Sequence, residues 1–428
     1  LETSLLDRHG ALLRPLNAAR LDALLWDGER DAAERMIPRV GAGEAAVARA
    51  RLALQARAEG VNALIAAIPA ALQADPGLAH DRFRWRLNRG LTDEAAALLR
   101  DLPPEGLGRP QAWAAQRARL ARRAMAEGDP GLAYDLAARH GLSDHGTDMA
   151  DLEWLAGYVA LRFLDRPADA LRHFQTLRTR SVSPITLGRA GYWEGRAHEA
   201  LGDEAAARAA FAFGAQHQTA FYGQLSAERL GMDLDPVLLA APAYPDWHTL
   251  PFARSEVLQA ALLLHAAGQF YEARRFTLQL AETLQTEAEL GALAQLWLDR
   301  GEPHFALRIA KAAIARGILL PRAYFPVTEL AEAQLTVPAD LTLSIARRES
   351  EFDYRVSSSA DARGLMQVLP ATGAHTARRL GIAFDEARLT SDPAYNAVLG
   401  AGYLQEMSQQ FGGTLSMVAA AYNAGPGR

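Results

Sequence analysis

The feature that most constrains the fold of this chain is a phrase that recurs along its first three quarters. Each copy has apolar residues at helical spacing, a turn centred on glycine, and a second helix rich in alanine. The turn glycines are Gly28, Gly90, Gly128, Gly202, Gly268 and Gly301. Positions 90 and 128 are 38 residues apart, and positions 268 and 301 are 33 apart, close to the tetratricopeptide period of about 34 residues. Because a helical hairpin cannot bury its apolar face alone, the repeats predict a superhelical stack with a concave surface.

The predicted array has two interpretations. It could be a scaffold that shapes the access of a large substrate, or a general protein-binding surface, and repeats alone favour the second. Aromatic residues in the array could line a groove, although aromatics at helical spacing are more often part of a core. They are Trp154, Tyr192, Trp193, Phe221 and Tyr222.

Two segments containing several prolines, at 234–247 and 319–326, interrupt the helical periodicity. We therefore predict three domains: a helical superhelical domain over 1–240, a helical linker domain over 241–322, and a third domain over 323–428.

The composition excludes several classes of function. The chain carries 45 basic and 50 acidic side chains, for a net charge of -5. It has no basic run that could neutralise a phosphate backbone, so we expect no nucleic-acid partner. Lys311 is the only lysine, which we attribute to biased coding. The absence of cysteine excludes disulfides and thiolate chemistry.

No stretch approaches the roughly 20 apolar residues of a transmembrane helix. The eleven histidines include no pair at i, i+4 beside a carboxylate, so neither a metal site nor a cofactor is predicted. The chain starts at Leu1, without a methionine or a signal pattern, and stops at Arg428 directly after a turn signal. We expect a fragment at both ends, with any signal peptide already removed.

The third domain contains a carboxylate in an unusual position. Leu341, Ile345 and Glu349 follow i, i+4, i+8 spacing on a helix that Asp340 is expected to cap. If that apolar face is buried, desolvation should raise the pKa of Glu349 and keep it protonated near neutrality, as a general acid requires. The alternative is a helix-end glutamate paired with an arginine at 347 or 348, and position alone favours that alternative.

The segment after this helix, 355–370, is polar and small and then briefly apolar, which predicts an irregular loop or a small sheet. Gly364 permits close backbone approach, and Gln367 carries both a donor and an acceptor suited to sugar hydroxyls and acetamides. Helices are predicted to start at Pro370 and at Asp392-Pro393. A last helix after Thr414 should place Tyr422 and Asn423 at its end, pointing into a cleft.

Four blocks in this order resemble the catalytic domain of soluble lytic murein transglycosylases, relatives of goose-type lysozyme. They are Glu349-Ser350, Gly364-Leu365-Met366-Gln367, Asp392-Pro393-Ala394-Tyr395-Asn396 and Ala421-Tyr422-Asn423-Ala424-Gly425-Pro426-Gly427. The helical array is also similar to that family's ring-shaped superhelix and linker domain. The resemblance implies a mainly α fold, a ring-like array of helical hairpins followed by a lysozyme-like domain that lacks the family's C-terminal part.

The resemblance implies cleavage of the β-1,4 bond between N-acetylmuramic acid and N-acetylglucosamine in peptidoglycan, with 1,6-anhydromuramoyl ends as products. Glycosidases normally use two carboxylates, and Glu351, Asp353 and Asp361 are the nearby candidates for a second. The resemblance removes that requirement and implies that Glu349 is the single acid/base. A hydrolytic muramidase remains an alternative, as does a non-catalytic cell-wall scaffold.

The other roles follow from the resemblance by position. Ser358 is expected beside the substrate acetamido or peptide region, and Tyr422 is expected to be a substrate-contacting aromatic. Gln367 and Asn423 should supply hydrogen bonds in the cleft, while Met366 and Leu369 should bind substrate through their apolar side chains. The substrate implies a periplasmic location, and the array is expected to bind other cell-wall enzymes.

Overall fold

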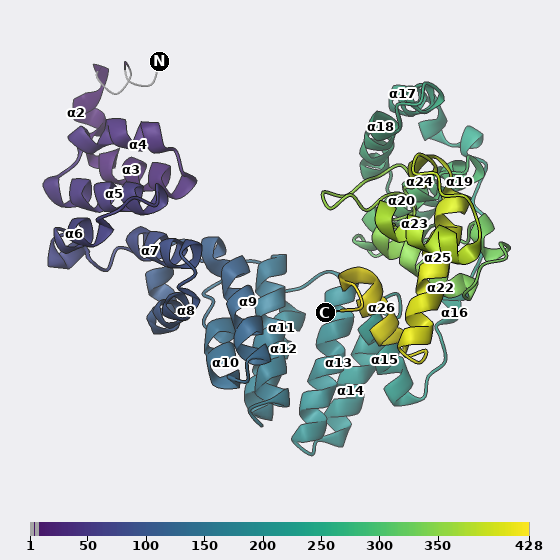
Figure 1. Ribbon diagram of the computed structural model, residues 1–428, viewed down its shortest axis with the longest axis horizontal. Helices are drawn as coiled ribbons and strands as arrows, with labels where there is room; N and C mark the ends of the chain where they lie inside the picture. The colour runs from purple at the N-terminus through teal and green to yellow at the C-terminus, as the bar shows by residue number, and fades with distance from the viewer. Residues whose placement is uncertain (1–3, 5–7, 428) are drawn as a thin grey trace. The chain divides into compact units, whose positions relative to one another are not determined.

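The computed structural model describes residue 4 and residues 8–427, and its secondary structure is almost entirely α-helical (Figure 1). The described residues form no strand, and the only bridges are Ser357 with Arg363 and Arg363 with Val368. The predicted mainly α fold is confirmed. The chain divides into two compact units, Leu1–Leu234 and Asp235–Arg428, while the predicted division into three domains stays a prediction.

The first unit is a succession of helical hairpins, coloured purple to teal in Figure 1. Its α-helices are α2 (Gly10–Leu13), α3 (Asn17–Asp27), α4 (Arg30–Met36), α5 (Ala42–Gln55), α6 (Val61–Ala66), α7 (Pro76–Asn88), α8 (Thr92–Asp101), α9 (Gln111–Ala126), α10 (Pro130–Ala138), α11 (Thr147–Arg162), α12 (Pro167–Thr179), α13 (Pro184–Ala200), α14 (Glu204–Ala215) and α15 (Phe221–Leu230).

The second unit contains the remaining helices. They are α16 (Pro236–Leu239), α17 (Glu256–Ala266), α18 (Phe270–Thr283), α19 (Glu287–Asp299), α20 (Pro303–Ile314), α21 (Pro321–Tyr324), α22 (Ala339–Glu349), α23 (Pro370–Leu380), α24 (Arg388–Ser391), α25 (Pro393–Gln410) and α26 (Leu415–Ala424). None of the helices in the described part of the chain is long and apolar enough to cross a membrane.

The turns between paired helices form where the repeated glycines predict them. All six of these glycines have a positive φ, from 71° at Gly301 to 87° at Gly128, a backbone region that side chains with a Cβ rarely adopt. The hairpin of α11 and α12 was not predicted, because its left-handed residue is Asp165, with φ 51°.

Small residues set the closest helix crossings. A Cβ added to Gly191 of α13 would lie 2.6 Å from the backbone nitrogen of Gly214 on α14, so the two helices touch through their backbones. Tyr192 and Trp193 on the same helix are buried in a cluster of aromatic rings, which supports the core interpretation for these two residues. Phe221 is exposed.

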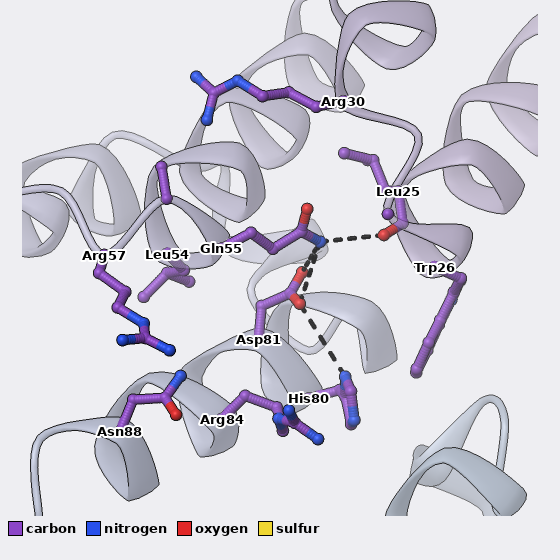
Figure 2. Close-up of a pocket in the computed structure, with 12 residues that line it drawn as sticks. Leu25, Trp26, Arg30, Leu54, Gln55, Arg57, His80, Asp81, Arg84 and Asn88 are labelled. Atoms are coloured by element: carbon purple, nitrogen blue, oxygen red, sulfur yellow. Dashed lines mark hydrogen bonds and ion pairs between the residues drawn. The ribbon is translucent and has the colours of Figure 1, made fainter.

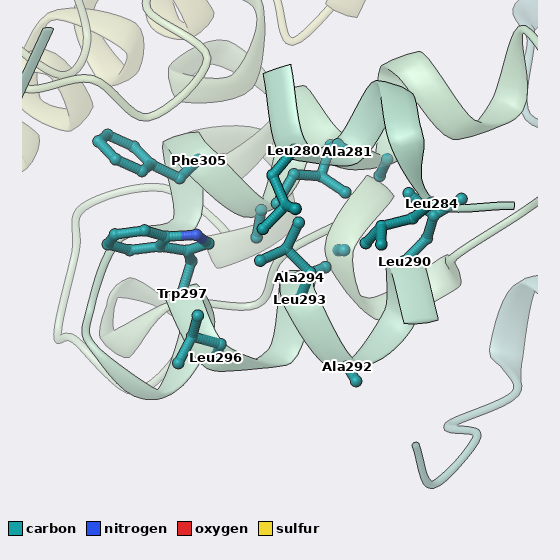
Figure 3. Packing of buried hydrophobic residues seen from close by; sticks show 14 of the residues in the cluster. Leu280, Ala281, Leu284, Leu290, Ala292, Leu293, Ala294, Leu296, Trp297 and Phe305 are labelled. Carbon is teal, nitrogen blue, oxygen red and sulfur yellow. The ribbon is translucent and has the colours of Figure 1, made fainter. Parts of the chain in front are cut away.

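The second unit has two hydrophobic cores. The first is formed by helices α17 to α21 and centres on Trp297, whose ring lies 4.7 Å from that of Phe305 (Figure 3). The second includes Ile345, Met366 and Leu399. Leu307 of α20 belongs to this second core, so α20 contributes to both.

The helix boundaries around the predicted site differ slightly from expectation. Asp340 is not the cap of α22, because the helix already starts at Ala339 and Asp340 lies in its first turn, where it accepts from the backbone of Leu341. Asp392 does cap α25, since its Oδ1 accepts from the backbone N–H of Tyr395 at 2.9 Å. Pro370 starts α23 as predicted.

Candidate active site

Glu349 is the last residue of α22, and the face that carries it turns toward the second core. Ile345 on this face is buried, and Leu341 packs against the same core. Glu349 itself is half-buried. Desolvation by burial raises the pKa of its carboxyl, and the nearby charge of Arg348 only partly opposes this shift. The direction predicted from the apolar stripe is confirmed.

The ion-pair alternative for Glu349 lacks support. Arg347 donates from Nε to the carbonyl of Tyr324 at 3.0 Å, and its guanidinium lies over the rings of Tyr324 and Phe325. Arg348 is exposed. Within the described part of the chain, no hydrogen bond or ion pair engages the Glu349 carboxyl, so only the nearby charge of Arg348 favours its charged form.

A polar clamp holds the loop that faces the end of α22. Asn396 of α25 is completely buried and makes three hydrogen bonds, each of 2.9 Å. Its Nδ2 donates to the carbonyls of Arg363 and Leu389. Its Oδ1 accepts from the N–H of Met366. Gly364 lies within this clamp with φ 75°, and a Cβ there would be 1.9 Å from the carbonyl oxygen of Leu389. The close backbone approach predicted for Gly364 is therefore present.

Two further hydrogen bonds join this loop to neighbouring helices. The hydroxyl of Ser350, next to Glu349, donates to the carbonyl of Leu365 at 2.6 Å. The hydroxyl of Tyr422 donates to the carbonyl of Met366 at 2.8 Å. The loop carries one of the four resembling blocks and is thus fixed between α22, α25 and α26, which carry or adjoin the other three.

A pocket of about 200 Å³ opens beside this loop. Its lining is Gln367, Val368, Leu369, Thr372, Tyr403, Tyr422, Asn423, Ala424 and Gly425. It therefore brings together four of the predicted substrate-binding residues, at 367, 369, 422 and 423. Glu349 is not among the lining residues. It does act on one of them, Tyr422: burial of the Tyr422 phenol raises its pKa most, and the charge of Glu349 raises that pKa further.

The other five lining residues, Val368, Thr372, Tyr403, Ala424 and Gly425, were not predicted as site residues. The ring of Tyr403 lies 5.6 Å from that of Tyr422. Tyr403 lies within α25, and a tyrosine within a helix gives no sign in the sequence of which neighbour it will meet. The side chain of Gln367 donates from Nε2 to the carbonyl of Gly364 at 2.9 Å, which leaves its Oε1 available to a ligand.

Two of the predicted residues do not reach the pocket. The side chain of Met366 is completely buried and packs against Gly400, where an added Cβ would be 2.4 Å from its sulfur. A direct substrate contact of this side chain is therefore not possible in this structure. Ser358 lies in an exposed turn, where its hydroxyl accepts from the N–H of Ala362 at 3.0 Å.

The three carboxylates that follow Glu349 in the next twelve residues are all paired with cations. The pairs are Glu351 with Lys311 and Arg308, Asp353 with Arg274 and Arg355, and Asp361 with Arg363. Burial alone would raise the pKa of Glu351, but the hydrogen bonds from Lys311 and Arg308 outweigh it and lower that pKa. None of the three carboxylates lines the pocket.

With this geometry established, the comparison with known families is decisive for the C-terminal segment. Residues 327–428 match the family model of the transglycosylase SLT domain. This segment is an SLT domain. The match spans α22 to α26 and includes Glu349 and every residue that lines the pocket.

Curated relatives carry consistent names. A Haemophilus influenzae protein provisionally described as a soluble lytic murein transglycosylase is 30% identical over 210 residues, which cover 49% of this chain and 35% of that protein. The soluble lytic murein transglycosylase of Escherichia coli K12 is 38% identical over 109 residues, 25% of this chain and 17% of that protein. The aligned part thus spans about a third or less of these relatives.

A solved structure extends the similarity beyond the SLT domain. An inactive glutamate-to-glutamine variant of lytic transglycosylase Slt from Pseudomonas aeruginosa matches with a TM-score of 0.70 and 23% identity, covering 99% of this chain and 68% of that one. At this identity the similarity establishes the fold alone, and it confirms the predicted helical superhelical architecture.

A larger cavity of about 450 Å³ lies outside the SLT domain, among α3, α5 and α7 of the first unit (Figure 2). Its buried carboxylate, Asp81, accepts from Arg51 at 2.8 Å and from Gln55 at 3.1 Å. Burial lowers the pKa of His80 in its wall to about 4, so this imidazole is neutral. The carboxylate of Asp81 is thus already paired, although burial raises its pKa above the ordinary value. The described residues also contain no cluster of three side chains that could hold a metal ion.

Proposed function

We propose that this chain is a peptidoglycan lytic transglycosylase that uses Glu349 as its single acid/base. The observation that carries the proposal is a half-buried glutamate without a neutralising partner, placed at the helix end of an SLT domain. The names of the curated relatives support murein as the substrate. The bond proposed to be cleaved is the β-1,4 link between N-acetylmuramic acid and N-acetylglucosamine.

The chemistry needs one proton that leaves Glu349 and then returns. The protonated carboxyl donates to the glycosidic oxygen as the bond to the anomeric carbon breaks, and the 2-acetamido group of the substrate stabilises that carbon. The resulting carboxylate accepts the proton of the 6-hydroxyl, whose oxygen then bonds to the anomeric carbon. The product is a 1,6-anhydromuramoyl end, and Glu349 is protonated again without any water being consumed.

The ion pairs around the site favour this scheme over a pair of carboxylates. A nucleophile or base must have a free carboxylate close to the anomeric carbon, whereas Glu351, Asp353 and Asp361 are all bound to cations. A raised pKa at Glu349 suits the first step, because the group must still hold its proton when substrate binds.

The pocket provides the proposed contacts to the sugar. Leu369 and the ring of Tyr403 offer apolar surface, while Asn423 and the Oε1 of Gln367 offer hydrogen bonds. Met366 contributes through its backbone, which receives the hydroxyl of Tyr422. A contact by Ser358 would require a part of the substrate that extends to its exposed turn, such as the peptide.

The substrate implies a periplasmic location, which is part of this proposal. A role of the helical array in binding other cell-wall enzymes stays a prediction. The hydrolytic muramidase and the non-catalytic scaffold are the competing functions, and the products formed from peptidoglycan separate all three.

The test is mass spectrometry of the muropeptides released from purified sacculi by the wild-type chain, by Glu349→Gln and by the control Glu332→Gln. Glu332 is an exposed glutamate of the same domain. We expect products with anhydro ends from the wild type and the control, and none from Glu349→Gln. Products with reducing ends would replace the proposal with the muramidase, and no products from any chain would favour the scaffold.

A further inference from the structure

We infer that helix α20 holds the loop that follows Glu349, and that Lys311, Arg308 and Glu302 are positioning residues for the acid/base. The inference deepens the proposed function and rests on it. Two observations support it. Ion pairs join residues 351–355 to α20 and to Glu302, the residue directly before that helix, and the backbone of the loop is in an unfavourable conformation.

The loop has a backbone that local sequence does not favour. Glu351 and Phe352, the second and third residues after Glu349, have φ values of 53° and 66°. Residues with a Cβ adopt this left-handed region at a cost in free energy, and such conformations persist where surrounding contacts hold them. Phe352 is buried in the SLT domain core, which holds one of the two residues.

Helix α20 holds the other. The carboxylate of Glu351 binds Lys311, and Arg308 donates to it at 3.1 Å. The ring Nδ1 of His304 lies 2.9 Å from the carbonyl oxygen of the same glutamate. Three residues of α20, spaced along one face of the helix, thus engage both the side chain and the backbone of a residue two positions after Glu349.

Glu302, the residue directly before α20, holds the far end of the loop. Arg355 donates through two nitrogens to the two carboxylate oxygens of Glu302, at 2.7 and 3.1 Å. Glu302 is buried and is also 2.9 Å from the ring of His265. A bidentate pair of this kind fixes orientation as well as distance, and the guanidinium stacks 3.7 Å from the ring centre of Phe270.

Helix α20 is well placed to act as a rigid support. Phe305 and Ile309 belong to the first core of the second unit, and Leu307 belongs to the SLT domain core. The helix therefore cannot shift without disturbing one of the two cores. Lys311 is the only lysine of the chain, and its partner is the carboxylate nearest to Glu349 in sequence.

The test compares Lys311→Met, which removes the cation, with Lys311→Arg, which keeps it. Carbon-13 NMR of carboxyl-labelled glutamate gives the pKa of Glu349, whose signal is identified by its loss in Glu349→Gln. Because Arg348, and not Lys311, is the charge that acts on the Glu349 pKa, a shift in Lys311→Met reports a change in loop geometry. We expect the pKa to fall toward the ordinary value of a glutamate in Lys311→Met and to stay raised in Lys311→Arg.

Kinetics give the second readout, with Arg89→Met as the control because Arg89 pairs with Glu59 in the first unit. We expect kcat to fall about tenfold in Lys311→Met with KM unchanged, which corresponds to one interaction of ordinary strength. If Lys311→Met does not fold, the more exposed Arg308→Met replaces it.

A folded variant with an unchanged Glu349 pKa would overturn the inference. A wild type that releases no products would instead remove the proposed function, and the pKa comparison would still decide whether α20 positions the glutamate. The two failures are therefore distinguishable.

Discussion

At the scale of single residues, the environment of Glu349 determines its chemistry. Its carboxyl has no hydrogen-bond or ion-pair partner among the described residues, whereas Glu351, two positions later, binds two cations and has its pKa lowered. The two glutamates are nearly adjacent in sequence, yet burial dominates at one and ion pairing at the other. Environment, not residue type, therefore gives the two glutamates opposite pKa shifts.

The raised pKa of Glu349 has a consequence for stability. A carboxyl whose pKa is higher in the folded state binds more protons when folded, so stability falls as pH rises from the unfolded pKa through the folded one. Glu349→Gln removes this penalty. We expect its Tm to exceed that of the wild type by about 1–3 °C at pH 7, and the difference to vanish below the ordinary pKa of glutamate, about 4.3. Calorimetry across this pH range is the measurement, and an equal difference at every pH would contradict the prediction.

Asn396 and Asn423 form a matched pair for a second prediction. Asn396→Ala would leave the N–H of Met366 and the carbonyls of Arg363 and Leu389 without their partner. Buried unsatisfied groups are costly, so we expect a loss of about 3 kcal/mol in unfolding free energy. Asn423→Ala, at an exposed residue of the pocket, should change stability by less than about 0.5 kcal/mol. Guanidinium-induced unfolding of the two variants measures the difference. Similar losses in unfolding free energy would show that the hydrogen bonds of Asn396 do not stabilise the loop.

At the scale of elements, glycines have two different functions in the helical hairpins. Those in the turns supply a left-handed backbone and have open space around them, as at Gly202. Those within helices allow contact between backbones, as at Gly191. The sequence pattern revealed the first function because it depends only on neighbouring residues, whereas the second depends on the partner helix.

These two functions predict different costs for the same substitution. Gly191→Ala would place a methyl 2.6 Å from a backbone nitrogen of α14, which cannot move aside like a side chain, so we expect a loss of about 2–3 kcal/mol. Gly202→Ala meets no atom within 4 Å and has only its positive φ to strain, for about 1 kcal/mol. Urea unfolding of both variants measures the difference, and a larger cost at 202 would contradict the assignment.

A buried glutamate in α11 gives an opposite pH dependence. Burial alone would raise the pKa of Glu153, but hydrogen bonds with His140 and His173 outweigh it and lower the pKa to about 2. A depressed pKa contributes stability that is present above the unfolded value and is lost as pH falls from about 4.5 toward 2. We expect Glu153→Gln to unfold more easily at pH 7 and to lose less stability over that acid range, as followed by circular dichroism.

At the scale of the whole molecule, every contact described for the site arises within the second unit. The pocket, the Asn396 clamp and the ion pairs of α20 all lie between residues 235 and 428. Both hydrophobic cores of this unit are built from its own helices. The first unit has separate cores of its own.

We therefore expect a chain of residues 235–428 to fold alone and to keep the environment of Glu349. Circular dichroism should show a cooperative helical transition, and NMR should give the same raised pKa of Glu349 as in the full chain. A shorter chain that starts at 323 lacks α20 and is the control, in which the pKa should fall. An unfolded 235–428 chain would show that the first unit is needed for stability.

Features that depend on local spacing could be predicted from the amino-acid sequence alone. Helical hairpins, their left-handed glycines, the apolar face that carries Glu349 and the cap at Asp392 all follow from residues a few positions apart, because helix periodicity and turn geometry are local properties. The resembling blocks likewise indicated the C-terminal family, and four of the predicted residues meet in one pocket.

Only the tertiary structure decided which side chains meet across long distances in the chain. The three hydrogen bonds of Asn396 and the ion pair between Glu351 and Lys311 join residues from different elements, and packing between elements buries Met366. Burial and pairing depend on how elements pack, and a side chain at a given helical position can be a core residue, a ligand or a clamp according to its neighbours. The apolar face that carries Glu349 was therefore visible in the sequence, whereas the contacts around it were not.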